Sequence, residues 1–244
     1  MPQTQYKVWH VGSPVGQGVM GSVHIGVAGI AKAATPDLPF VVANELICYN
    51  LARAILLPIP PGFIITRDNA PNYASLDFNL SGAALPPADP EIVVRDSSYT
   101  AGGILVYDVW VVNTDRHEAN LAHDQLRNKV EIFDHSHAFF HGSDARTAKD
   151  RLVQNENELG IGGHCLAREI VDPMSIEQWI RRIESVPDFY IKDVIKAATD
   201  VGLPNDDEQF CADFLCGRRH KLRDLVRDNQ NAFPKIQPIL GAQP

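Results

Sequence analysis

The chain has 244 residues, of which 45% are hydrophobic, and its formal net charge at pH 7 is −8. A length near the upper size of one domain, with an ordinary apolar content, predicts one domain or two packed lobes around a real core. The net negative charge argues against bulk electrostatic binding to nucleic acid or to an anionic membrane.

The N-terminal third predicts a β-rich region with one helix. Residues 5–31 mix Val and Ile with many glycines, which is typical of short strands joined by flexible turns. Residues 39–57 repeat apolar side chains at helical spacing and are followed by three prolines that end the helix. GFIIT at 62–66 reads as a strand. The stretch 67–91 is rich in Pro, Asn, Asp and Ala, with a strand-like piece at 73–78, and is the best candidate for a hinge.

The remaining two thirds predict a mostly helical region. The pattern is helical and apolar over 98–112, and a strand follows at 130–134. Residues 141–164 are polar and carry three glycines near their end, which predicts a long mobile loop. Three further helices are predicted at 173–185, 187–201 and 205–229. The order predicts an α+β fold of two lobes: a small β-rich lobe over about 1–72, a hinge over about 73–80 and a larger helical lobe over about 81–244.

The cysteines, the first ten residues and the length of the apolar runs indicate the cellular location that we expect for the protein. No two of the four cysteines form a CxxC pair, so a structural zinc site or a disulfide framework is not expected, and free thiols are: Cys48, Cys165, Cys211 and Cys216. The first ten residues lack the apolar stretch of a signal peptide, and the longest apolar run, at 104–112, is too short to span a bilayer. We therefore expect a cytoplasmic protein with no membrane partner.

Two apolar runs each end abruptly in polar residues, in NTDRHEAN at 113–120 and in IFDHSHAFF at 132–140. Asp115 and Asn120 are five positions apart, and Asp134 follows a strand fourteen residues later. Phosphoryl transfer needs one carboxylate to orient the attacking hydroxyl, and it needs amide and carboxylate oxygens to hold Mg²⁺ at the phosphates. The spacing therefore predicts a phosphoryl-transfer site, with helix caps and turn residues as the structural alternative.

These two runs resemble the catalytic and metal-binding loops of HipA-like kinases, part of the wider group that includes the phosphatidylinositol kinases. Residues 44–62, NELICYNLARAILLPIPPG, are similar to the helix of that family's small lobe. Residues 216–234, CGRRHKLRDLVRDNQNAFP, resemble the closing helix of short HipA-like chains. The resemblance extends over roughly 30–233 and implies a two-lobed kinase fold that uses ATP and Mg²⁺.

Within that resemblance, Asp115 is implied as the catalytic base or as the residue that positions the nucleophile, and Asn120 and Asp134 are the implied Mg²⁺ ligands. Asp134 is followed by His-Ser instead of the Phe-Gly of many kinases. The acceptor implied is a hydroxyl, most simply Ser or Thr of a protein, and an antitoxin-type or regulatory protein partner is compatible with the family. No nucleic acid is expected as a direct partner.

The resemblance also implies a phosphate-binding lysine paired with an acidic residue of the helix. Glu45 is that acid, and Lys32 is the natural lysine because no other lies between Lys7 and Lys129. Lys7 remains the rival. A phosphate-covering loop is implied by the glycine run, whose members fall at the spacing G-x-G-x-x-G, although ordinary hairpin turns fit as well: Gly16, Gly18 and Gly21.

Two other functions remain open. A pseudokinase scaffold would bind nucleotide without transferring phosphate. A metal-dependent hydrolase would use the imidazoles of His135 and His137 together with Asp115 and Asp134. Against the hydrolase, structural roles are expected for His135, bracing Asp134, and for His117, packing under the catalytic loop. Surface positions are expected for His123 and His141.

Overall fold

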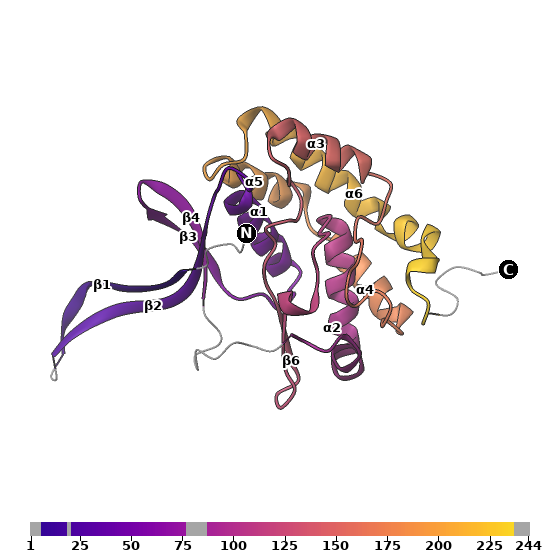
Figure 1. Ribbon diagram of the computed structural model, residues 1–244, viewed down its shortest axis with the longest axis horizontal. Helices are drawn as coiled ribbons and strands as arrows, with labels where there is room; N and C mark the ends of the chain where they lie inside the picture. The colour runs from indigo at the N-terminus through magenta and orange to yellow at the C-terminus, as the bar shows by residue number, and fades with distance from the viewer. Residues whose placement is uncertain (1–5, 19–20, 77–86, 237–244) are drawn as a thin grey trace.

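The computed structural model describes residues 6–18, 21–76 and 87–236. An antiparallel sheet with one helix forms the N-terminal half, and a larger group of helices forms the other (Figure 1). The first half contains β1 (Tyr6–Gly18), β2 (Gly21–Ala33), α1 (Val41–Ala54), β3 (Gly62–Arg67) and β4 (Ala70–Leu76). The second contains α2 (Pro90–Trp110), β5 (Leu121–Asp124), β6 (Lys129–Ile132), α3 (Ala145–Gln154), α4 (Pro173–Glu184), α5 (Asp188–Thr199) and α6 (Glu208–Asp228). The predicted α+β class is confirmed.

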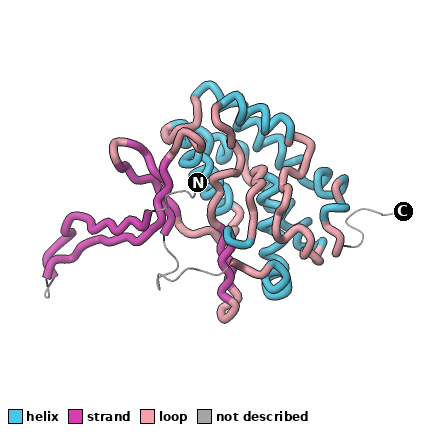
Figure 2. The backbone as a smooth tube through the Cα atoms, in the orientation of Figure 1, coloured by secondary structure: helices cyan, strands magenta, loops and turns pink. Residues whose placement is uncertain are grey.

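A long hairpin replaces the short strands that the sequence predicted at the N-terminus. β1 and β2 are 13 residues each, and their register closes with Gly18 opposite Gly21. The register shifts on both sides of Pro14, because proline has no backbone N–H to donate to the ladder. Figure 2 shows the two strands projecting side by side away from the helices. The glycines here interrupt the ladder less than the sequence suggested.

The base of this hairpin joins a four-stranded sheet of order β1-β2-β4-β3. β2 pairs with β4, which places Lys32 opposite Tyr73. β3 and β4 are joined through Asp68 and Asn69, whose φ angles are +53° and +59°, as a two-residue hairpin turn of the type I′ class requires. Residues 67–76 of the predicted hinge stretch therefore belong to this hairpin, and residues 77–86 lie outside the described residues.

Helix α1 connects the two halves. It lies in the predicted place and is buried over most of its length, with Ile47 and Leu51 fully buried. Its contacts are with β2, β3 and β4 on one side and with α5 on the other. The chain leaves the helix at Leu56, with φ of +59°, and the prolines that follow prevent its continuation. The apolar core is accordingly continuous from α1 into the helical half.

Helix α2 begins earlier than the sequence predicted. Asp89 accepts hydrogen bonds from the backbone N–H groups of the first turn, Pro90 follows it, and a non-helical residue, Ser97, separates this turn from the apolar part. Every residue from 101 to 110 is buried. A Cβ on Gly103 would overlap the Trp179 ring, so the glycine allows α2 to pack closely on α4. In the described part of the chain, no helix is long and apolar enough to cross a membrane.

The segment 141–164, predicted as a long mobile loop, contains helix α3. Asp144 caps the helix by accepting a hydrogen bond from the backbone N–H of Thr147 at 2.8 Å. Only Ala148 and Leu152 are buried, one turn apart, so the apolar signal is two residues in ten. The mostly polar composition concealed this helix. The three helices predicted after it are confirmed as α4, α5 and α6.

Candidate active site

Antiparallel pairing of β5 and β6 brings the two polar segments together. Leu121 pairs with Ile132, so Asn120, which precedes β5, lies beside the residues that follow β6. The Phe133 backbone N–H donates to the Asn120 carbonyl at 3.4 Å. The Nδ2 group of Asn120 donates to the Asp115 carbonyl at 2.9 Å, which fixes the amide and directs its Oδ1 elsewhere. The pairing therefore places Asp115, Asn120 and Asp134 at one end of the β5–β6 hairpin.

Lys32 joins the two halves of the molecule through carboxylates. Its Nζ lies 2.5 Å from Oε1 of Glu45 on α1 and 2.7 Å from Oδ1 of Asp134. The expected contact between Lys32 and Glu45 is thus present. The rival, Lys7, pairs with Ile30 in the β1–β2 register, and its side chain lies outside what the structure describes.

Burial and charge act in opposite directions on these groups. Burial raises the pKa of the Glu45 carboxyl, but the Lys32 ammonium and His135 outweigh it and hold the pKa below its ordinary value. Burial likewise raises and Lys32 lowers the pKa of Asp134, with a net decrease. Burial lowers the pKa of Lys32, whereas the two carboxylates raise it, with a net increase. All three groups are charged at neutral pH, so two carboxylates face one ammonium and a surplus negative charge remains.

Ser136 completes this group, and sequence reasoning missed it. Its hydroxyl lies 2.8 Å from Oδ1 of Asp134 and 3.2 Å from Oε1 of Glu45, and it accepts from the Lys32 ammonium at 3.0 Å. We call Lys32, Glu45, Asp134 and Ser136 the ionic cluster. The only signal for Ser136 in the sequence was its position two residues after Asp134.

Asp134 has a strained backbone. Its φ is +60°, in the left-handed region that few residues other than glycine adopt. The backbone N–H of the next residue, His135, donates to Glu45 Oε1 at 3.0 Å, and the Ser136 hydroxyl holds the Asp134 carboxylate. Strain of this kind persists only where the surroundings enforce it, and it is concentrated at functional sites.

Asp115 is half-buried and lies beside a pair of histidines. Among the residues that the structure describes, its carboxylate has no ion-pair partner. Its negative charge acts on His141, whose ring lies 4.6 Å from that of His137, centroid to centroid. Burial, followed by His137 and Arg151, lowers the pKa of His141 to about 4 against the opposing effect of Asp115. His141 is therefore not the exposed surface residue that the sequence suggested.

A second group of charges lies beneath the 113–120 loop. Arg116 is fully buried and donates to both carboxylate oxygens of Asp108, at 2.8 and 3.2 Å. His164 Nε2 lies 3.1 Å from the same carboxylate, and Asn113 Nδ2 donates to it at 2.9 Å. Arg116 also donates to the carbonyls of Asn120 and Phe133, at 2.8 and 2.9 Å. We call Asp108, Asn113, Arg116 and His164 the inner network.

The inner network packs beneath the 113–120 loop, the role that the sequence suggested for His117. His117 is exposed, and its Nδ1 accepts from the Ala119 N–H. The imidazole reaches solvent because the residue caps a short 3-10 turn, Glu118–Asn120, and this leaves Arg116 to point inward. A signal for the network was available: Asp108 is a lone carboxylate in the apolar run ILVYDVWVV, and a buried carboxylate requires a partner.

The comparisons with known proteins concern the fold. No family model matches the sequence, and no curated protein matches it. The crystal structure of the proinflammatory kinase CtkA from Helicobacter pylori covers 95% of this chain and 98% of its own, with a TM-score of 0.61 and 13% sequence identity. The chain has the fold of this kinase. HipA of Shewanella oneidensis MR-1, solved with HipB and operator DNA, covers 91% of this chain, which spans 65% of HipA, at 13% identity and a TM-score of 0.47.

Among the residues that the structure describes, the alternative metal-dependent hydrolase has no ligand set. His135 is fully buried, with Nε2 2.9 Å from the Arg116 guanidinium, and His137 faces His141. Within the described ranges, no group of three or more His, Cys, Asp or Glu side chains is arranged to hold a metal ion. His123 also differs from expectation, since its side chain is only 3% exposed. The four cysteines are free, as expected.

The glycine run lies far from the ionic cluster. Gly18 and Gly21 lie opposite each other at the outer end of the β1–β2 hairpin, and Gly16 pairs with Val23 close to them. Gly21 and Lys32 are eleven positions apart on the extended β2, a length of roughly 36 Å along the strand. The structure therefore does not bring these glycines to the cluster, and their contact with phosphate stays a prediction.

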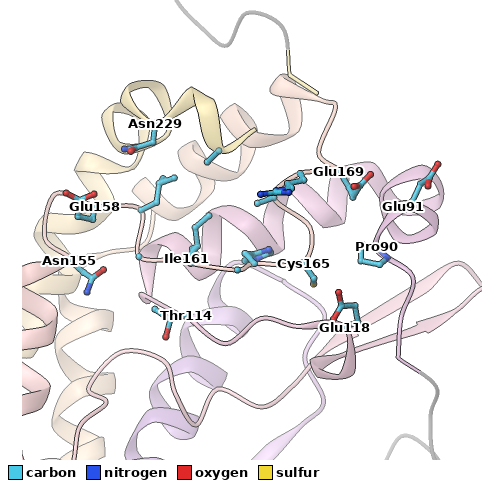
Figure 3. Close-up of a pocket in the computed structure, with 18 of the residues that line it drawn as sticks. Pro90, Glu91, Thr114, Glu118, Asn155, Glu158, Ile161, Cys165, Glu169 and Asn229 are labelled. Atoms are coloured by element: carbon cyan, nitrogen blue, oxygen red, sulfur yellow. The ribbon is translucent and has the colours of Figure 1, made fainter. Parts of the chain in front are cut away.

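A groove of about 1000 Å³ runs beside the 113–120 loop (Figure 3). Thr114 and Glu118 of this loop line it, together with the segment 155–169 and the start of α2. Five of its lining side chains are acidic: Asp89, Glu91, Glu118, Glu158 and Glu169. The groove is open to solvent, so it can accommodate an extended segment of another molecule beside Thr114, the neighbour of Asp115 in the chain.

Proposed function

We propose that this chain is a kinase that transfers the γ-phosphoryl group of ATP to a hydroxyl, with Mg²⁺ as cofactor and with Ser or Thr of a protein as acceptor. The observation that carries the proposal is the position of Lys32 between Glu45 and Asp134, at 2.5 and 2.7 Å, in a chain with a kinase fold. A lysine beside phosphates must be oriented by an acidic partner, and Glu45 is suited to orient it.

The residues present fit a magnesium ion. Asp134 keeps 17% of its side chain exposed, and Asn120 has an Oδ1 that its fixed amide leaves available. The ionic cluster has one carboxylate more than it has ammonium groups, so a cation there would balance its charge. Asp134 and Asn120 would hold Mg²⁺, which, when bound, neutralises the negative charge of the phosphates.

The chain's own groups then have separate tasks. Lys32 donates to phosphate oxygens while Glu45 fixes its direction. Asp115, with no ion-pair partner among the described residues, accepts the proton of the acceptor hydroxyl and orients it. Arg116 joins the backbones on which Asn120 and Asp134 lie, and so keeps their separation constant.

A protein acceptor is supported by the groove beside Thr114 and Glu118, because an open groove of about 1000 Å³ admits an extended peptide. A regulatory protein of the antitoxin type, a cytoplasmic location and the lobe boundaries near residues 72 and 80 remain proposals of the same kind.

The test is incubation of the chain with γ-labelled ATP, Mg²⁺ and a protein mixture, followed by mass spectrometry of the phosphorylated species. Asp115→Ala should lower transfer by about 10²–10⁴-fold, the usual contribution of a general base, while ATP affinity is retained. Asp124→Ala, on the β5–β6 hairpin, is the control. Wild-type turnover in Asp115→Ala would remove this residue from the mechanism, and ATP binding with no transfer by the wild-type chain would favour the pseudokinase.

A further inference from the structure

Arg151 on α3 contacts both loops of the candidate active site. Its Nη1 donates to the Phe139 carbonyl at 2.7 Å, and its Nη2 donates to the Val112 carbonyl at 2.8 Å. Nη2 also lies 3.2 Å from the Thr114 hydroxyl and 3.2 Å from the His137 carbonyl. One guanidinium thus binds the segment that leads to Asp115 and the segment that follows Asp134.

Two of these carbonyls belong to residues with unfavourable backbone angles. Val112 has a φ of +51° and Phe139 a φ of +46°, and a branched side chain such as valine rarely adopts this region. The Phe139 N–H also donates to the Val111 carbonyl at 2.8 Å, so the two turns are in direct contact. The fork of the guanidinium binds each turn at its strained residue, and a lysine could not reproduce that geometry with one nitrogen.

The environment of Arg151 differs from that of an ordinary ion pair. Among the described residues, its hydrogen-bond partners are three carbonyls and one hydroxyl, with no carboxylate. Burial lowers the pKa of the guanidinium to about 10, so it remains charged at neutral pH. Since no carboxylate among the described residues pairs with the guanidinium, its contribution lies in the arrangement of its hydrogen bonds, which no neutral side chain on α3 could supply.

We propose that Arg151 is a positioning residue, which sets the placement of the Asp115 loop relative to the Asp134 loop without touching nucleotide or acceptor. The proposal rests on the proposed kinase function. A change of about 1 Å in the alignment of reacting groups can lower a rate by about 10²-fold, so the effect of this residue should appear mainly in turnover.

The test compares Arg151→Lys and Arg151→Ala with two controls. Arg218→Lys is the matched control, because Arg218 on α6 is also buried and has its pKa lowered to about 10. Among the described residues, it too donates to carbonyls, in the segment 155–159 and at Val109. Arg146→Ala removes an arginine with a 92% exposed side chain from the same helix. Folding of each variant is checked by its unfolding midpoint, and Arg151→Lys serves if Arg151→Ala does not fold.

We expect Arg151→Lys to lower kcat, expressed per nucleotide-binding site, by about 10²-fold and to leave the KM for ATP unchanged. Millimolar guanidinium, but not sodium at equal ionic strength, should restore part of the kcat of Arg151→Ala. A loss of kcat that matches the fall in folded fraction, or an equal loss in Arg218→Lys, would reduce Arg151 to a general structural role and overturn the proposal.

Amide hydrogen exchange separates this proposal from the kinase proposal, since it needs no activity. Exchange should increase in both segments, 112–120 and 134–141, in Arg151→Lys and in neither in Arg218→Lys. If the wild-type chain transfers no phosphate but exchange changes in this way, the kinase function fails and the positioning role stands. If the wild type is active and Arg151→Lys has unchanged kcat and exchange, the positioning role is wrong.

Discussion

The ionic cluster and the inner network are both made of buried charges, yet their charge balance differs. In the inner network, one carboxylate, Asp108, faces one guanidinium, Arg116, and both side chains are 0% exposed. In the ionic cluster, two carboxylates share one ammonium, and Lys32 and Asp134 keep 12% and 17% of their side chains exposed. The first group is balanced and closed, and the second carries a surplus negative charge with access to solvent.

This difference separates support from function. A balanced and fully hydrogen-bonded pair has no capacity left for a ligand, and it fixes the backbone of the 113–120 loop through the carbonyls that Arg116 binds. A cluster with surplus negative charge is suited to bind a cation, and its side chains can exchange partners when a cation binds. The inner network should therefore control stability, whereas the ionic cluster should control nucleotide use.

The largest effect is expected from Asp108→Asn. Removing one partner of a buried pair leaves the Arg116 guanidinium without its counter-ion, which costs about 3–5 kcal/mol of unfolding free energy. Glu156→Gln is the control, because the Lys221–Glu156 pair is exposed and its loss should cost about 0.2–1 kcal/mol. Urea unfolding of both variants measures the difference, and equal costs would show that the inner network is no more important than a surface pair.

Next in size are Lys32→Met and Glu45→Gln. Each should lower kcat/KM for ATP by about 10²-fold, a loss typical of removing one preorganised donor. The double variant should be little worse than either single one, because the two residues act as a unit. Lys149→Met, which removes a lysine from the Lys149–Asp207 pair, should have no effect on kcat/KM. Additive losses in the double variant would mean that Glu45 does not orient Lys32.

A smaller effect is expected from Ser136→Ala. The hydroxyl bonds Asp134, Glu45 and Lys32, and the net value of such a bond is about 0.5–1.5 kcal/mol, so affinity for ATP with Mg²⁺ should fall by up to about tenfold. Ser185→Ala, which removes an exposed hydroxyl at the end of α4, is the control. Unchanged affinity in a Mg²⁺ titration would remove Ser136 from the cluster's function.

The sequence predicted those parts of the fold whose patterns are local. The period of α1 and the prolines after it, and the three C-terminal helices, were readable because each carries an apolar stripe. Helix α3 was not, because only Ala148 and Leu152 of its residues are buried. The β1–β2 hairpin was mistaken for short strands because its glycines suggested turns, although only Pro14 interrupts the pairing.

The candidate site was predictable at the positions that carry charge in a motif, and not at those defined by three-dimensional contact. The contact of Lys32 with Glu45 followed from their order in the chain and from the family resemblance. Ser136 and Arg151 had no such signal, because a serine or a helical arginine is ordinary in sequence and becomes notable only through its partners. Asp108 was the exception, since its place in an apolar run already required a buried partner.

The smallest expected effect is a pH dependence at His141. Its pKa in the folded chain is about 4, lower than the ordinary value of about 6.5, because burial, His137 and Arg151 disfavour the proton more than Asp115 favours it. Between these two pH values the unfolded chain binds more protons, so stability falls as the pH decreases from about 6.5 to about 4. Glu45 and Asp108 have pKa values below the ordinary range, and their contribution is lost only below about pH 4.

His141→Gln should therefore flatten the curve of unfolding free energy above pH 4 and leave the acid limb unchanged, while His220→Gln, at an exposed position of α6, should alter neither. Parallel curves for the wild type and His141→Gln would show that this imidazole titrates alike in the folded and unfolded chains.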